Sequence, residues 1–315
     1  MVTDKIDNKD FPIIFMGTPD FAVASLKALV ERDFHIAAVV TSPDKPAGRG
    51  MQLQKSAVKI FAEKNNLLIL QPANLKAPEF ANELKKINAA LQVVVAFRML
   101  PEIIWNMPPM GTINLHASLL PQYRGAAPIN HAIINGEKET GITIFKLQHA
   151  IDTGNILATE KVKIGEIETA GELYDRLKIA GATLLTDTIL KIQKNSLKEI
   201  PQETLSENIS LKPAPKIFKK DTAIDWHKTT TEVYNFIRGL SPYPAAHSFL
   251  QEKLLKIFTA TKEINKNTEK PGEVFTDGKT FLKYSCSDGF IHVLELQWEG
   301  KKRMNVTEFL KGFRA

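Results

Sequence analysis

The stretch IIFMGTPDFAVASLKALVERDFHIAAVV, residues 13–40, contains two apolar runs separated by a helical pattern. Ile13 to Met16 predicts a buried strand that ends at Gly17. Phe21 to Glu31 predicts a helix, and Ile36 to Val40 predicts the next strand. A strand, a helix and a second strand in close succession are typical of a βαβ unit with parallel strands.

The same alternation continues over the first two thirds of the chain. We expect helices at 56–64, 78–87 and 172–192, and strands at 67–70, 91–96, 111–116 and 142–147. This order predicts an α/β fold with a mostly parallel sheet covered by helices on both faces. Ligands of such sheets bind beyond the carboxyl ends of the strands, so residues that directly follow strands are the first candidates for a site.

The composition and periodicity of the sequence change after the long helix expected at 172–192. Residues 193–215 are polar, contain three prolines and lack periodicity, which is typical of an interdomain linker. Beyond them, short β-like runs separated by Asp-Gly turns predict a small barrel with one helix near 230–239. We therefore expect a first domain over residues 1–195, a linker over 196–215 and a second domain over 216–315.

Composition limits the class of protein. The chain has 315 residues and one cysteine, Cys286, which excludes a disulfide framework within the chain and a multi-thiolate zinc site. No apolar run approaches the ~20 residues that span a bilayer. Met1 to Asp10 is polar with mixed charge, unlike a signal or transit peptide. We expect a soluble cytoplasmic protein that does not bind membranes.

The net charge of +6 is concentrated near the C-terminal end. Residues 1–210 contain 23 basic and 23 acidic side chains, whereas residues 211–315 contain 18 and 12. Such a surplus attracts polyanions, of which nucleic acid is the commonest. Ordinary solubilising charge is the alternative interpretation.

The densest group of reactive side chain types lies in GTINLHASLLP, residues 111–121. Asn114 and His116 are two apart at the end of a predicted strand, so they point to the same side. An amide and an imidazole together can polarise a carbonyl and stabilise an oxyanion. Asp152, which opens the sequence Asp-Thr-Gly after a strand, can orient a histidine or accept a proton. The alternative is that all three only satisfy loop backbone groups or cap a turn.

A long connection, Thr41 to Lys55, carries the cations Lys45, Arg49 and Lys55. It is either a basic loop that clamps a phosphate-bearing substrate or a disordered tip. Other sites are excluded by missing residues: Met16-Gly17-Thr18-Pro19 is no dinucleotide fingerprint, and the chain has neither a phosphate-loop motif nor a Gly-x-Ser-x-Gly elbow. The seven histidines lack metal-ligand spacing, so we expect no metal ion.

These motifs resemble, in order and spacing, the catalytic signature of the 10-formyltetrahydrofolate-dependent formyltransferase family. The signature comprises Asn114-x-His116, SLLP at 118–121 and DTG at 152–154. The tRNA-specific branch of that family is suggested by further motifs along nearly the whole chain: FMGTPDF at 15–21, PDKPAGRG at 43–50, YRGAAPI at 123–129, IDW at 224–226, SPYP at 241–244 and GKKRM at 300–304.

The resemblance implies a Rossmann-like formyltransferase domain and an OB-like β-barrel domain that contacts tRNA. It implies transfer of the formyl group of 10-formyltetrahydrofolate, a co-substrate, to the α-amine of methionine on initiator tRNA, by a monomer. The implied residues fall into three groups. Catalytic residues are Asn114, His116 and Asp152; folate-binding residues are Val95, Ala96, Phe97, Ser118, Leu119, Leu120 and Pro121; tRNA-binding residues are Lys45, Arg49, Lys301, Lys302 and Arg303.

The sequence departs from the family pattern beside the folate segment. Phe97-Arg98 replaces a more typical Tyr-Gly, and Ala117 stands where Pro or Gly is common. Arg98 could pair with the glutamate tail of a folate or point to solvent. Three rival functions are formylation of another amine, tRNA binding without catalysis, and hydrolysis of the formyl-folate.

Overall fold

We describe a computed structural model of the chain, which covers residues 10–47, 52–206, 209–265 and 269–313. The contacts divide the chain into two compact units. The first comprises Met1–Arg124, Gly141–Val162 and Asp175–Lys212, and the second comprises Gly125–Thr140, Lys163–Tyr174 and Pro213–Ala315. Two earlier segments, Gly125–Thr140 and Lys163–Tyr174, thus group with the C-terminal residues. The domain boundaries expected at 195 and 216 stay a prediction.

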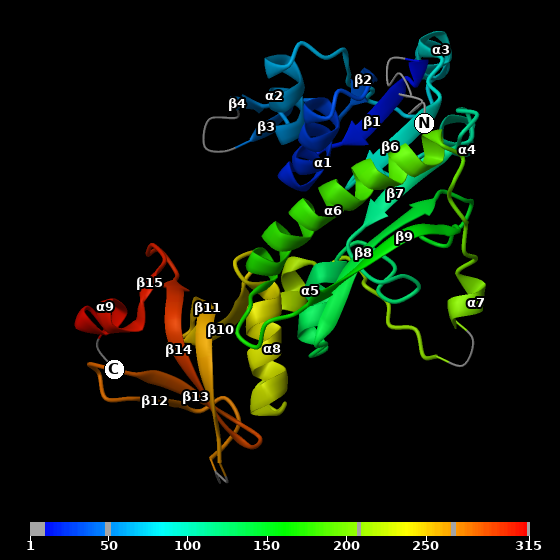
Figure 1. Ribbon diagram of the computed structural model, residues 1–315. Helices are drawn as coiled ribbons and strands as arrows, with labels where there is room; N and C mark the ends of the chain where they lie inside the picture. Colours follow the sequence, from blue (N-terminus) through cyan, green and yellow to red (C-terminus); the bar gives the residue numbers. More distant parts are fainter. Residues whose placement is uncertain (1–9, 48–51, 207–208, 266–268, 314–315) are drawn as a thin grey trace. The chain divides into compact units, whose positions relative to one another are not determined.

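The first unit is built on a seven-stranded sheet (Figure 1). Its strand order is β5 (Ile69–Leu70), β2 (Ile36–Val40), β1 (Ile13–Gly17), β6 (Leu91–Val95), β7 (Thr112–His116), β8 (Glu139–Lys146) and β9 (Ile156–Lys163). The strands from β5 to β7 are parallel, whereas β8 runs antiparallel to β7. The predicted mostly parallel α/β sheet is therefore confirmed.

Strand β1 is an interior strand of this sheet, between β2 and β6, and its residues are apolar on both sides. All five are buried. Ile14 and Met16 pack into a cluster with Phe80 and Leu84 of helix α3 (Pro78–Ile87). At Gly17 a Cβ atom would lie 2.6 Å from the Cβ of Ala22, so only glycine lets helix α1 (Asp20–Glu31) begin this close to the strand.

The long helix α6 (Ala170–Gln193) covers one face of β7. A Cβ at Gly181 would lie 3.0 Å from Leu115 and 3.5 Å from Ile142, so this part of the helix packs directly on the sheet. Because alternate residues of a strand point to opposite faces, Asn114 and His116 face away from α6. The other face of β7 is therefore covered by loops rather than by α6.

The strand order reverses beside β1, since β2 and β5 extend the sheet to one side and β6 to β9 extend it to the other. The carboxyl ends of β1, β6 and β7 lie along one edge because these strands are parallel and adjacent. In doubly wound sheets this reversal opens the crevice in which ligands bind.

Several elements escaped the sequence analysis. The long connection at 41–55 contains an antiparallel hairpin, β3 (Lys45–Ala47) and β4 (Gln52–Gln54), and its cation Lys55 forms an ion pair of 2.8 Å with Glu63. Strand β9 was also missed, because alternate residues along it are exposed and polar. Four further short helices are α4 (Glu102–Trp105), α5 (Pro128–Ile134), α7 (Glu203–Ser206) and α9 (Val306–Lys311). Helix α2 (Ala57–Lys64) lies as expected.

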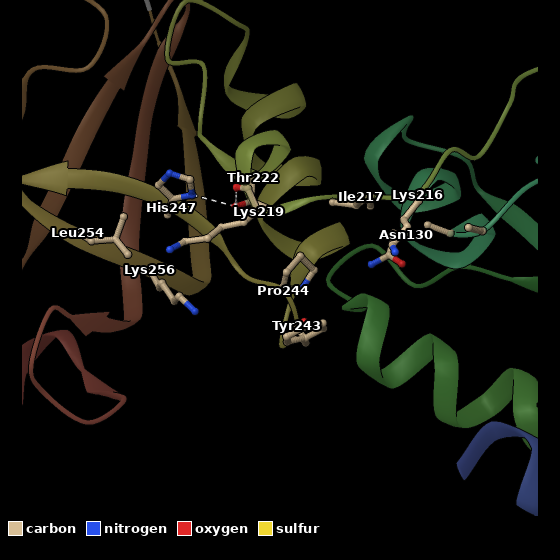
Figure 2. Close-up of a pocket in the computed structure, with 12 residues that line it drawn as sticks. Asn130, Lys216, Ile217, Lys219, Thr222, Tyr243, Pro244, His247, Leu254 and Lys256 are labelled. Carbon is tan, nitrogen blue, oxygen red and sulfur yellow. Dashed lines mark hydrogen bonds between the residues drawn. The ribbon is translucent and has the colours of Figure 1, made fainter. Parts of the chain in front are cut away.

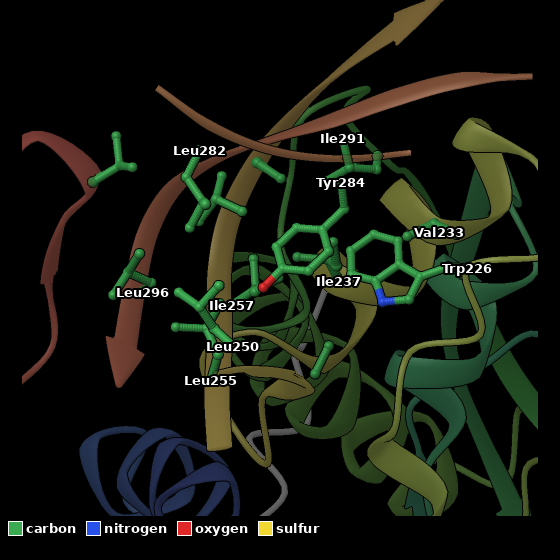
Figure 3. Packing of buried hydrophobic residues seen from close by; sticks show 14 of the residues in the cluster. Trp226, Val233, Ile237, Leu250, Leu255, Ile257, Leu282, Tyr284, Ile291 and Leu296 are labelled. Carbon is green, nitrogen blue, oxygen red and sulfur yellow. The ribbon is translucent and has the colours of Figure 1, made fainter. Parts of the chain in front are cut away.

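The second unit contains a six-stranded antiparallel sheet, which confirms the expected β-rich C-terminal domain. Its order is β10 (Ala246–Leu250), β11 (Lys253–Ile264), β14 (Gly289–Trp298), β13 (Leu282–Cys286) and β12 (Val274–Thr276), with β15 (Met304–Asn305) paired to β14. Helix α8 (Thr230–Leu240) packs on this sheet through Val233 and Ile237. In their shared core the rings of Trp226 and Tyr284 stack 4.4 Å apart (Figure 3).

None of the helices in the described ranges combines the length and apolarity required to traverse a membrane.

The burial of Cys286 in the core of the second unit predicts low reactivity of its thiol. Cys286 is fully buried, and burial, together with the charge of Asp288, raises its pKa to about 12. Since the thiolate is the reactive form, alkylation by iodoacetamide at pH 8 should run roughly 10³-fold slower than for an exposed cysteine. Labelling should become complete once the chain is unfolded in denaturant, which provides the control. Rapid labelling of the native chain would contradict this packing.

Candidate active site

Asn114 and His116 lie on the face of β7 that α6 does not cover. Their cross-strand partners on β8 are Phe145, opposite Asn114, and Thr143, opposite His116. The edge of the Phe145 ring meets the His116 ring, with centroids 6.5 Å apart. The four side chains therefore share one face at the end of the sheet, as their spacing requires.

The loop that follows β7 is closed over this face by buried hydroxyl groups. Thr143 Oγ1 donates to the carbonyl of Ser118 at 2.7 Å and accepts from the backbone N–H of Leu120 at 3.0 Å. Ser118 Oγ donates to the carbonyl of Gln122 at 2.7 Å. Thr143 and Ser118 are both fully buried. These bonds fix the shape of the loop where it returns to His116.

The imidazole of His116 is oriented by the same loop. Nε2 lies 2.9 Å from the carbonyl oxygen of Tyr123. A carbonyl only accepts, so Nε2 is the protonated donor and Nδ1 is the nitrogen that faces the rest of the site. Nδ1 lies 3.9 Å from Oδ2 of Asp152, at an exposure of 7% for His116 and 13% for Asp152. This separation is an ion-pair distance when the ring carries a second proton.

Asp152 lies close to His116 because the connection between β8 and β9 turns back along the sheet, which the order of the strands does not predict. Lys146 at the end of β8 pairs with Ile113, near the start of β7, so the β8–β9 connection must run back to reach His116. The connection is closed by a bond from the N–H of Lys146 to the carbonyl of Asn155, at 2.9 Å. A Cβ at Gly154 would overlap the carbonyl of Lys146, so glycine is required there.

The segments predicted to bind folate follow two adjacent strands. Val95 ends β6 beside Leu115 of β7, and Phe97 packs against the apolar cluster that contains Ile14 and Met16. Ser118, Leu120 and Pro121 are buried, Leu119 is half-buried, and Ala96 is exposed. An apolar edge beside the Asn114 amide suits the ring system of a folate, and both segments lie at the carboxyl edge where such crevices form.

The guanidinium of Arg98 is turned towards the backbone of the segment after β5. Its guanidinium donates to the backbone carbonyls of Pro72 at 2.8 Å and Ala73 at 3.3 Å, and it lies over the Phe97 ring. Burial lowers the pKa of this guanidinium. The arginine thus ties the segment after β6 to the segment after β5.

The residues predicted to bind tRNA differ in their availability. Lys301 and Lys302 are exposed between β14 and β15, whereas Arg303 forms two bonds with Glu295, at 2.7 and 2.5 Å. Lys45 is exposed on β3. Arg49 lies outside the described residues.

A basic cavity of about 350 Å³ lies within the second unit and was missed in the sequence (Figure 2). Its lining combines three lysines, a histidine and a tyrosine that is 82% exposed. These residues are Lys216, Lys219, Lys256, His247 and Tyr243. The only signal in the sequence was the basic surplus after residue 210, which gives no positions.

The histidine of this cavity is neutral at pH 7. The Thr222 hydroxyl donates to the carbonyl of Lys219 at 2.8 Å, so its oxygen accepts from Nδ1–H of His247 at 2.9 Å. Burial lowers the pKa of His247, and the charges of Lys219 and Lys256 lower it further. Nε2 is then the unprotonated nitrogen, and the positive charge of the cavity comes from the lysines.

Two further buried polar residues went unnoticed in the sequence. Thr143 lies in the middle of an apolar strand, and Gln202 lies in the segment expected to be a linker, yet each is at most 1% exposed. Within the described part of the chain, no group of three or more His, Cys, Asp or Glu side chains could hold a metal ion.

Family models match both parts of the chain. Residues 11–189 match the model described as formyl transferase, and residues 216–314 match that of the formyl transferase C-terminal domain. The chain is 50% identical over 310 residues to the methionyl-tRNA formyltransferase of Bacteroides fragilis, covering 97% of this chain and 96% of that one. It is 51% identical to the methionyl-tRNA formyltransferase of Phocaeicola vulgatus, with 98% of each chain covered.

Solved structures share the fold. One is the sugar 3N-formyl transferase WlaRD, determined with dTDP and 5-N-formyl-THF, at a TM-score of 0.66, 24% identity and coverage of 93% of this chain and 99% of that one. Another is HypX from Aquifex aeolicus in complex with tetrahydrofolic acid, at a TM-score of 0.64 and 18% identity, covering 95% and 47%. With half its residues identical to those of curated relatives over nearly full length, the chain belongs to the methionyl-tRNA formyltransferase family.

Proposed function

We propose that this chain transfers the formyl group of 10-formyltetrahydrofolate to the α-amine of methionine esterified to initiator tRNA. The observation that carries the proposal is the convergence of Asn114, His116 and Asp152 in a chain that is half identical to methionyl-tRNA formyltransferases over nearly its whole length. The reaction supplies formylmethionyl-tRNA for translation initiation, so we place the enzyme in the cytoplasm, where translation occurs; that it acts as a monomer is proposed from the family resemblance alone.

The folate co-substrate binds at the carboxyl edge of β6 and β7. Val95, Ala96 and Phe97 line one side, and the SLLP segment at 118–121 lines the other. This placement brings the formyl carbon close to Asn114, which lies on the strand between these segments. No metal ion takes part, since the amide and the imidazole provide the groups that polarise the carbonyl.

Transfer proceeds by direct attack of the neutral amine on the formyl carbon. A new C–N bond forms, and the formyl oxygen becomes an oxyanion that accepts hydrogen bonds from the Asn114 amide and from Nδ1–H of His116. The bond between carbon and N10 of the folate then breaks, and N10 takes up a proton from solvent, which balances the proton that the amine loses. The bond from His116 Nε2 to Tyr123 keeps the ring aligned, so that Nδ1 is the nitrogen presented to the substrate.

Asp152 has two connected roles. Its carboxylate stabilises positive charge on the His116 ring from 3.9 Å, and it accepts the proton that the amine loses, directly or through a water molecule. A carboxylate this close to a largely buried imidazole interacts more strongly than a pair in open water.

The tRNA contacts come from both units. Lys45 lies on the hairpin of the first unit, and Arg49 belongs in the sequence to the same basic connection, residues 41–55, which carries the acceptor-stem contact that the family resemblance implies. In the second unit the candidate contacts are Lys301, Lys302 and Arg303. The basic cavity is a further candidate, because its lysines suit phosphate groups and its exposed Tyr243 suits base stacking. We keep as part of this proposal a catalytic domain over 1–195, a linker over 196–215 and a tRNA-contacting domain over 216–315.

We expect Asn114→Ala, His116→Ala and Asp152→Ala each to lower turnover by at least about 10²–10³-fold, because each removes a group used only in the transition state. The measurement is transfer of labelled formyl from 10-formyltetrahydrofolate to charged initiator and elongator tRNAs. Thr204→Ala is a control outside these motifs, since its exposed hydroxyl donates to the carbonyl of Pro201. Near wild-type turnover in any of the three variants would refute the role assigned to that residue, and transfer to free amines or to water instead of tRNA would favour a rival function.

We expect the double variant Lys219→Ala, Lys256→Ala to bind tRNA more weakly and to reduce the slope of log K against log salt by about 0.7–0.9 per lost phosphate contact. Turnover at saturating tRNA should be unchanged, because both residues lie in the second unit, whereas Asn114, His116 and Asp152 lie in the first. Filter binding between 50 and 200 mM salt (about the range in which the effect is largest) measures the slope. An unchanged slope would remove the cavity from the tRNA interface.

A further inference from the structure

Gln202 is one of the most buried polar side chains of the first unit, at 1% exposure, although it lies in a polar, proline-containing segment. A buried carboxamide has two donors and an acceptor to satisfy, and leaving them unpaired is costly. In Gln202 both donors and the acceptor form hydrogen bonds. Their partners lie in the loop that carries Asp152 and in the loop that follows β7.

The amide nitrogen of Gln202 donates to the loop that carries Asp152. Nε2 lies 3.0 Å from the carbonyl oxygen of Asp152 and 2.7 Å from that of Gly154. The carbonyls on both sides of Thr153 are therefore held by one side chain. Asp152 also has a positive φ of 54°, a conformation that a non-glycine residue keeps only when its surroundings fix it.

The amide oxygen of Gln202 accepts from the loop that orients His116. Arg124 donates to Oε1 through Nε at 3.2 Å and through Nη2 at 2.7 Å. Arg124 directly follows Tyr123, whose carbonyl lies 2.9 Å from His116 Nε2. A single carboxamide thus joins the backbone that sets the Asp152 carboxylate to the residue next to the one that sets the imidazole.

The segment that carries Gln202 is itself fixed to the sheet. The backbone groups of Ile200 and Ile156 exchange two hydrogen bonds, of 2.8 and 2.9 Å, at the start of β9. Gln202 is therefore held in place from β9 and can act as a fixed reference for both loops.

We propose that Gln202 is a positioning residue for formyl transfer, which sets the Asp152 carboxylate relative to the His116 ring. The proposal rests on the catalytic roles assigned to Asp152 and His116 above. Gln202 itself touches neither substrate. Its contribution lies in preorganisation, since a displacement of about 1 Å in a catalytic group can cost about 10²-fold in rate.

The central test is Gln202→Met, which keeps the length of the side chain and removes every hydrogen bond. We expect kcat to fall about 10–100-fold while KM for folate and for tRNA changes less than about threefold, because the lost interactions act on the transition state. Gln202→Glu is the second variant. It still accepts from Arg124 but places a carboxylate oxygen against two carbonyls, so it should lose turnover without losing the buried partner of Arg124.

Glu199→Gln and Thr204→Ala are matched controls on the same segment. The Glu199 side chain contacts Asn155 and Lys146 but not the carbonyls of Asp152 or Gly154, and the Thr204 hydroxyl donates only to Pro201. Both should keep turnover within about twofold of the wild type, as expected for exposed positions. Thermal unfolding of all variants shows whether each one is folded at the assay temperature.

A double-mutant cycle with Asp152→Asn separates positioning from a structural role. If Gln202 acts through Asp152, adding Gln202→Met to Asp152→Asn should lower kcat by less than about threefold further. Multiplicative effects, or wild-type kcat in folded Gln202→Met and Gln202→Glu, would overturn the proposal while leaving the function intact. Wild-type turnover in Asp152→Asn would instead refute the proposed role of Asp152, and the Gln202 proposal with it.

Discussion

The site depends on the period-two alternation of β7. Leu115 faces helix α6, so the side chains on either side of it, Asn114 and His116, are directed to the opposite face of the sheet. A shift of one residue in the pairing of β7 would exchange these faces and place an imidazole against an apolar helix. The packing of α6 on Leu115 and Ile142 therefore fixes both the fold and the direction of the reactive groups.

Buried polar side chains hold the loops around Asn114 and His116 in one arrangement. Thr143 closes the loop after β7, and the Tyr123 carbonyl fixes which nitrogen of His116 faces the site. Gln202 connects this loop to the one that carries Asp152. Each group is hydrogen-bonded because an unpaired polar atom at this depth would be costly, so the satisfied network also limits the positions that the loops can occupy.

The two units use charge in different ways. In the first unit one carboxylate lies 3.9 Å from one largely buried imidazole, where little water screens the interaction between them. In the second unit lysines gather around an open cavity, and the pKa of His247 is lowered by burial and further by the charges of Lys219 and Lys256. The first arrangement suits a chemical step, and the second suits attraction of a long polyanion whose binding depends on salt.

The sequence alone determined the α/β class, the strands β1, β2, β6 and β7, and the pairing of Asn114 with His116 on one face, because these follow from local periodicity. Its motifs also pointed to the family. The tertiary structure decided what depends on contacts between distant residues. The return of the Asp152 loop to His116 depends on the antiparallel pairing of β8, and the burial of Gln202 depends on the bonds between Ile200 and Ile156. Neither of these two features is visible as a local pattern in the sequence. A polar residue that a distant strand buries can have the same kind of sequence neighbours as a polar residue that is exposed on a linker.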